Sequence, residues 1–196
     1  MFLSIIGILA GIISASAYIP YIRDILAKTT KPERASWIIW VVLTGIAFFS
    51  QLAKGATTSL WLPGIETIGV TIVFLFSLHF GVGGMTKRDT FILICAASGL
   101  LLWYFTKEPA VALYIIIAVD AIGTVPTIIK SYEDPGSETL TTWVMVAIAG
   151  IFAMIAVGSF NIILLSYPFY IFAANAATAL AMVLGKNKKK LRKDER

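Results

Sequence analysis

Seven apolar stretches follow one another through this sequence, separated only by short polar turns. A helix needs roughly 20 mostly apolar residues to cross the hydrocarbon core of a bilayer. Only 14% of the 196 residues are charged, whereas a soluble domain has about 25%. This composition excludes a soluble enzyme and any large domain outside the membrane. We therefore predict an all-α membrane protein with seven transmembrane helices, at residues 3–26, 36–53, 59–82, 90–106, 109–131, 139–159 and 161–184.

The lysines and arginines between these stretches predict the orientation of the chain. Positive side chains are enriched on the cytoplasmic side of membrane proteins. With the N-terminus outside, fourteen of the sixteen lie inside and only Lys54 and Lys107 lie outside. We therefore expect an N-out, C-in topology. Seven of the basic residues lie between Lys186 and Arg196, a cytoplasmic tail suited to anionic lipid rather than to nucleic acid.

The sequence also contains an internal repeat marked by its rarer residues. A shift of 106 positions places Pro20 on Pro126 and Trp37 on Trp143. Three crossings reverse the direction of a chain, so a fourth helix is needed to bring a second three-helix unit back into parallel with the first. The sequence therefore predicts a 3+1+3 arrangement of two parallel three-helix bundles. The units are residues 1–83 and 109–185, the linker helix is in residues 84–108, and the basic tail is residues 186–196.

Two segments resemble the motif of the PQ-loop and SWEET-like transporter superfamily. The first is Tyr18-Ile19-Pro20-Tyr21-Ile22-Arg23 with Ser36-Trp37 after a basic turn, and the second is Val125-Pro126-Thr127-Ile128 with Thr142-Trp143. The glutamine that usually follows the proline is replaced by Tyr21 and Thr127. This departure leaves sugar, amino-acid and vitamin transport open. The resemblance implies a 3+1+3 fold and alternating access, with Pro20 and Pro126 acting as hinges.

Two acidic residues fall deep inside predicted spans, namely Asp120 in the fifth and Glu66 in the third. An ionised side chain is costly in hydrocarbon, so such residues are functional candidates. We expect Asp120 and Glu66 to bind substrate and to carry protons, with Asp120 either coupling proton movement or neutralising a cationic group. A protonated acid that only hydrogen-bonds to a neighbouring helix is the structural alternative.

The remaining candidate residues are polar or aromatic side chains in the spans and prolines that interrupt them. Trp40, a turn deeper than Trp37, could stack on a sugar ring or an aromatic solute. Resemblance to SWEET-like transporters places Asn175 at the substrate site, although the third span has no matching asparagine. The predicted substrate-binding set is Asp120, Glu66, Asn175, Trp40, Ser14 and Thr124. The predicted gate and hinge set is Pro20, Pro126, Pro63, Pro168, Trp37 and Trp143.

Other classes of function find little support in the sequence. Cys95 and His79 are each the only residue of their type, so neither a disulfide framework nor a metal site is expected. No phosphate-binding loop or nucleophile–base set is present, and we expect neither an enzyme nor a cofactor.

The function that fits these features best is secondary transport or facilitation of a small polar solute such as a sugar, an amino acid or a vitamin. The expected location is the plasma membrane of a prokaryote. A membrane receptor or scaffold on the same fold is the alternative. The oligomeric state is left open, homo-oligomers included.

Overall fold

The structure is a computed structural model that describes residues 1–30, 32, 34–81, 83–136 and 138–194, without the side chains of residues 88, 89, 126 and 191–194. Over these residues the chain forms seven α-helices and no strand. Each predicted span coincides with a helix to within three residues at either end, except that the last helix continues ten residues beyond the predicted end at 184. The helices are α1 (Phe2–Leu26), α2 (Arg34–Ala53), α3 (Trp61–Phe80), α4 (Lys87–Thr106), α5 (Pro109–Glu133), α6 (Leu140–Val157) and α7 (Ile162–Asp194), with a single 3₁₀ turn, η1 (Thr58–Leu60), before α3.

Six of these helices, among the described residues, are long and apolar enough to cross a membrane. The chain is accordingly a membrane protein with several membrane-spanning helices. In α4 the apolar stretch within the described residues runs from Thr90 to Thr106 and is shorter than those of the other six helices. Helices suit this environment because every backbone hydrogen bond within them is made inside the segment. The turn between α6 and α7 depends on Gly158, whose φ of 70° is left-handed.

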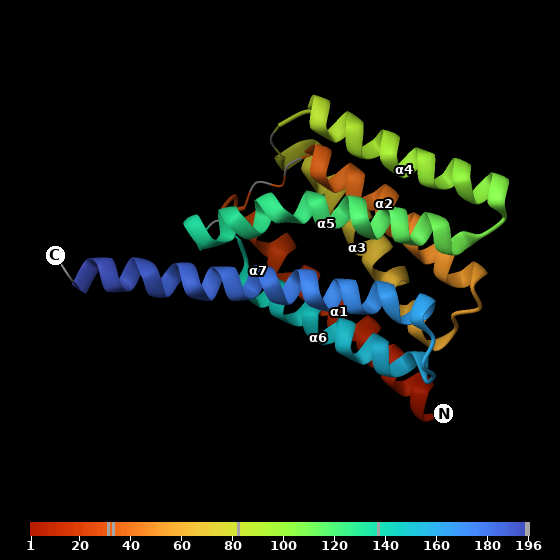
Figure 1. Ribbon diagram of the computed structural model, residues 1–196. Coiled ribbons are helices and arrows are strands. Elements are labelled where there is room, and N and C mark those ends of the chain that lie inside the picture. The colour runs from red at the N-terminus through yellow and green to blue at the C-terminus, as the bar shows by residue number, and fades with distance from the viewer. Residues whose placement is uncertain (31, 33, 82, 137, 195–196) are drawn as a thin grey trace.

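Six helices form a closed ring, and α4 lies outside it. Around the ring, α1 packs against α3, α3 against α2, α2 against α5, α5 against α7, α7 against α6, and α6 against α1. The helix α4 packs mainly on α5 and, less extensively, on α2. Figure 1 shows α4 at the edge of the bundle, on the far side from α1 and α6.

Small residues allow neighbouring helices of this ring to approach closely. Gly7 and Gly11 of α1 are buried against Thr58 and Trp61, so this GxxxG pattern packs α1 on the start of α3 within one chain. On the other side of the ring, a Cβ at Gly150 would lie 3.0 Å from Phe172 Cα, which places α6 tightly against the backbone of α7.

The helix prolines differ in their effect on the backbone. Pro20 lies inside α1 and Pro168 inside α7. Pro168 leaves the carbonyl of Leu164 without its helical partner, and the buried Gln51 of α2 donates to that carbonyl at 3.5 Å. Pro63 lies in the first turn of α3, where N–H groups lack helical partners, so no kink is expected there. Pro126 falls within α5, but its side chain is outside the described part of the chain.

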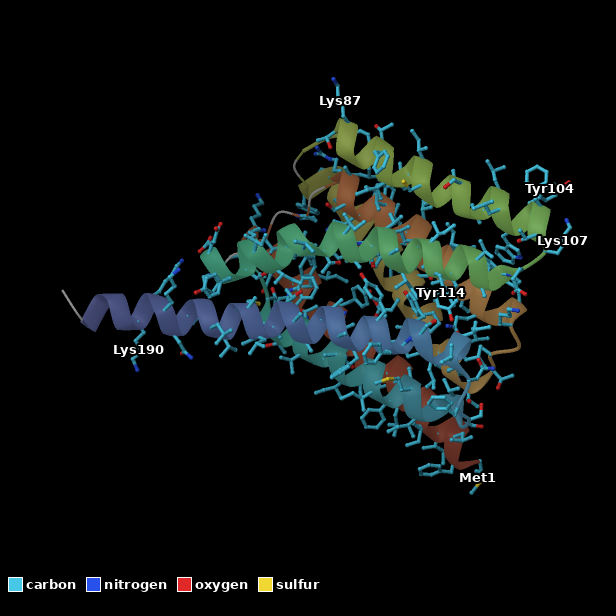
Figure 2. The ribbon with its side chains drawn as sticks, viewed as in Figure 1. Met1, Lys87, Tyr104, Lys107, Tyr114 and Lys190 are labelled. Atoms are coloured by element: carbon cyan, nitrogen blue, oxygen red, sulfur yellow. The ribbon has the colours of Figure 1, made fainter. Side chains whose placement is uncertain are left out.

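The two ends of the bundle carry the chain termini and most of the charged loops. Figure 1 shows the N-terminus at one end and the C-terminal part of α7 extending past the other helices at the opposite end. In Figure 2, Lys87 and Lys190 lie toward that second end, whereas Met1 and Lys107 lie toward the first. The basic tail is a continuation of α7, and its Lys189 pairs with Asp134 at 3.0 Å.

Candidate functional site

The ring of helices encloses a cavity of about 460 Å³. Residues from all seven helices line this cavity. It reaches the loop between α1 and α2 at Thr29 and Thr30, and the loop between α5 and α6 at Gly136 and Glu138. In the opposite direction it ends near Glu66, in the first half of α3. The cavity is therefore accessible from the end of the bundle that carries these two loops.

Asp120 lies on the cavity wall in the middle of α5. Trp40 of α2 donates its indole N–H to the Asp120 carboxylate at 3.1 Å. Tyr170 of α7 also hydrogen-bonds to this carboxyl group, and it lies 3.3 Å from Thr124 Oγ1. Thr124 itself donates to the Asp120 carbonyl at 2.9 Å. Three helices therefore hold one half-buried acid at the surface of the cavity.

Glu66 lies deeper than Asp120 and is only 6% exposed. Tyr18 of α1 donates to one Glu66 carboxylate oxygen at 2.8 Å, and Ser14 of the same helix donates to the other. Ser14 and Tyr18 are four residues apart and so lie on the same face of α1. Ser14 is fully buried and does not line the cavity. The predicted binding residue Ser14 thus holds Glu66 in place.

Tyr167 of α7 is buried within electrostatic range of both acidic positions. Its side chain is 2% exposed and interacts electrostatically with both Glu66 and Asp120. Tyr18, Tyr167 and Tyr170 were missed as site residues in the sequence analysis. One signal was available, since Tyr18 precedes Pro20 by two positions and Tyr167 immediately precedes Pro168. The prolines mark the parts of α1 and α7 that face the acids.

Aromatic rings cover the part of the cavity wall between Asp120 and the open end. The rings of Trp37 and Trp40 lie 5.0 Å apart at an angle of 89°, and Tyr21 lies 5.2 Å from Trp37. Trp143 of α6 also lines the cavity. The predicted gate residues Trp37 and Trp143 therefore both lie on the wall of one cavity.

Asn175 is buried on α7 and also lines the cavity. Its side-chain amide donates to the Ile171 carbonyl of its own helix at 2.8 Å. The carbonyl group of the side chain remains an acceptor for a neighbouring group. Asp120, Glu66, Trp40, Thr124 and Asn175, which the sequence predicted to bind substrate, thus share one cavity.

At the opposite end of the bundle, polar contacts join helices of the first and second halves of the chain. Thr58 of η1 donates to the Ala156 carbonyl of α6. Lys54, just after α2, pairs with Glu108, just before α5. This lysine ammonium and the Ala110 N–H lower the pKa of the Glu108 carboxyl below its usual value. The cavity lining includes none of these residues.

No group of three or more His, Cys, Asp or Glu side chains that could bind a metal lies within the described residues. Comparisons with protein-family models, with curated proteins and with solved structures find no match to this chain. The function must therefore be inferred from the cavity and the residues around it.

Proposed function

We propose that this chain is a secondary transporter or facilitator of a small polar solute and that it works by alternating access. The observation that carries this proposal is the cavity of about 460 Å³ inside the helix ring, with Asp120 and Glu66 on its wall. Binding sites for small molecules have volumes of about 300–1,000 Å³ and a few polar groups that fix orientation. Buried acids in membrane-spanning helices are typical of substrate and proton pathways.

The order of helices in the ring supports a 3+1+3 repeat. The ring has a twofold pattern. If α1 is exchanged with α5, α2 with α6 and α3 with α7, the same pairs of helices pack against each other. In each half, the first helix packs against the third and the third against the second. The outlying α4 is then the linker that restores the direction of the chain. Two parallel units that enclose a site between them are a known plan for transporters.

The two ends of the cavity support alternating access. The wall is open toward the loops that contain Thr30 and Glu138, while Thr58 and the pair Lys54–Glu108 hold the halves together at the other end. In the N-out, C-in orientation this is a cytoplasm-open state. Rocking of one unit against the other would break these outer contacts. Pro20, Pro126 and Pro168 are the proposed hinges, and Trp37 and Trp143 the proposed inner gate.

The charges of the tail support the proposed location. The helical tail of basic residues would lie against the anionic lipid of the cytoplasmic leaflet, and we place the protein in the plasma membrane of a prokaryote. No nucleic acid is a partner in this proposal. The two halves of one chain line the cavity together, so that transport does not require a homo-oligomer.

Proton coupling through Asp120 is tested in proteoliposomes that contain a trapped pH-sensitive dye. Sugars, amino acids, polyamines and vitamins are added one at a time, with an inward proton gradient and without one. We expect the transport of at least one solute to depend on the gradient and to be accompanied by proton movement across the membrane. Asp120→Asn should abolish proton movement. Asp134→Asn is the matched control, because Asp134 lies outside the cavity and pairs with Lys189.

Transport that keeps its pH dependence in Asp120→Asn would refute the coupling role. If none of these solutes enters the vesicles, the transport proposal is wrong. A receptor that binds at the same cavity would then become the better interpretation.

A further inference from the structure

The charges on the cavity wall are strongly unbalanced. Three acids line it, namely Glu66, Asp120 and Glu138, whereas Lys130 is the one lysine or arginine on the described wall. Lys130 is already paired with Glu138 at 3.1 Å. The two deep carboxyl groups therefore lack a basic partner on the wall. A wall of this kind attracts a positive solute and repels an anion.

Of the two deep acids, Asp120 is the one that is better placed to contact a solute. Glu66 is 6% exposed, and both of its carboxylate oxygens accept hydrogen bonds from hydroxyl groups of α1. Asp120 is half-buried and lies nearer the middle of the cavity wall. Its donors are the Trp40 indole N–H and the Tyr170 hydroxyl. These donors orient the carboxylate but supply no positive charge.

The indole that orients Asp120 belongs to an aromatic corner made by Trp37 and Trp40. Their rings meet almost at a right angle, 5.0 Å apart, and both line the cavity. Tyr21 extends the same wall beside Trp37. Cations within about 6 Å of an aromatic face are attracted by it, and desolvated cages of this kind hold quaternary ammonium groups. A carboxylate and the aromatic side chains of Trp37 and Trp40 thus line one part of the cavity.

We propose that the solute is a monovalent organic cation, an amine or a quaternary ammonium compound. Its charged nitrogen would lie between the Asp120 carboxylate and the corner of Trp37 and Trp40. This inference rests on the proposed function, because it assigns a substrate class to the same cavity. A bare metal ion fits poorly, since Mg²⁺ and Ca²⁺ require six or more oxygen ligands. The cavity of about 460 Å³ leaves room for an organic body beside the charged group.

The test compares compounds of the same shape with and without charge. Choline and its carbon isostere 3,3-dimethyl-1-butanol form the matched pair. Benzyltrimethylammonium, phenethylamine and glucose are tested beside them. Binding to the purified full chain in lipid nanodiscs is measured by isothermal titration calorimetry. We expect at least one organic cation to bind, and choline to bind at least about tenfold more tightly than its isostere. Equal binding of the isostere, or binding of glucose without any cation, would overturn the proposal.

Variants locate the site. Asp120→Asn and Trp40→Leu should each weaken cation binding by about tenfold or more, whereas Asp134→Asn should leave it unchanged. Circular dichroism and gel filtration check that each variant is folded. If Asp120→Asn is folded and keeps full preference for the cation, the site is not at Asp120. The comparison of choline with its isostere in the unmodified chain stays decisive if a variant fails to fold.

Uptake by proteoliposomes separates this inference from the proposed function. A cation that binds in the cavity but does not enter the vesicles would refute transport and would support the substrate class. Uptake of a neutral solute, without binding or uptake of any cation, would refute the substrate class and support transport.

Discussion

The packing of Tyr18 against Gly69 makes Gly69→Ala an informative perturbation of the site. A Cβ at this position of α3 would overlap three ring carbons of Tyr18. Tyr18 is only 8% exposed, so its ring has little free space into which it can move. The same ring holds the hydroxyl that donates to Glu66 at 2.8 Å. We therefore expect the added methyl group to displace this hydroxyl from Glu66.

The expected cost has two parts. Overpacking a filled core costs about 1–3 kcal/mol. Leaving a buried carboxyl oxygen without its donor costs about 1–3 kcal/mol. Tyr18→Phe removes the hydrogen bond but keeps the ring. Because Gly69→Ala and Tyr18→Phe lose the same bond, the double variant should be less destabilised than the sum of the two by roughly 1–3 kcal/mol.

The assay is unfolding of the purified chain by sodium dodecyl sulfate in mixed micelles, followed by circular dichroism and tryptophan fluorescence. Gly45→Ala in α2 is the matched control, since its Cβ would meet no described atom within 4 Å. In a helix interior this control should stabilise the protein by up to about 1 kcal/mol. The reasoning is refuted if Gly69→Ala is as stable as Gly45→Ala, or if the two site variants are additive.

Two further predictions concern single polar groups. Ser14→Ala should destabilise the chain by about 1–3 kcal/mol because it removes a donor from the buried Glu66 carboxyl group. Ser50→Ala should be neutral or stabilising because the Ser50 hydroxyl is buried without a partner among the described residues. Equal losses in the same unfolding assay would contradict this. Glu108→Gln should reduce stability above pH 4.5, which is the ordinary pKa of a glutamate carboxyl. At such pH values Lys54 pairs with an ionised Glu108. Since pairing lowers the pKa of Glu108, the difference in stability between the variant and the unmodified chain should be lost as the pH falls below 4.5. A difference that persists in acid would refute the role of the ion pair.

Much of the fold was predictable because the bilayer imposes simple rules. Each apolar stretch became a helix, since no other local structure satisfies its own backbone in hydrocarbon. The weakly marked turn between the sixth and seventh spans was also placed correctly, and Gly158 explains it by its left-handed conformation. The predicted span at residues 90–106 lies within α4.

The sequence by itself determined the helices and selected Asp120 and Glu66, because a charged group in an apolar run is visible without any knowledge of its neighbours. Only the tertiary structure decided their partners. Trp40 lies 80 positions from Asp120, and Tyr18 lies 48 positions from Glu66. Such pairs depend on the order of helices in the ring and on the rotation of each helix about its axis. Apolar residues on all sides of a membrane helix give little sign of that rotation, whereas packing and buried hydrogen bonds fix it.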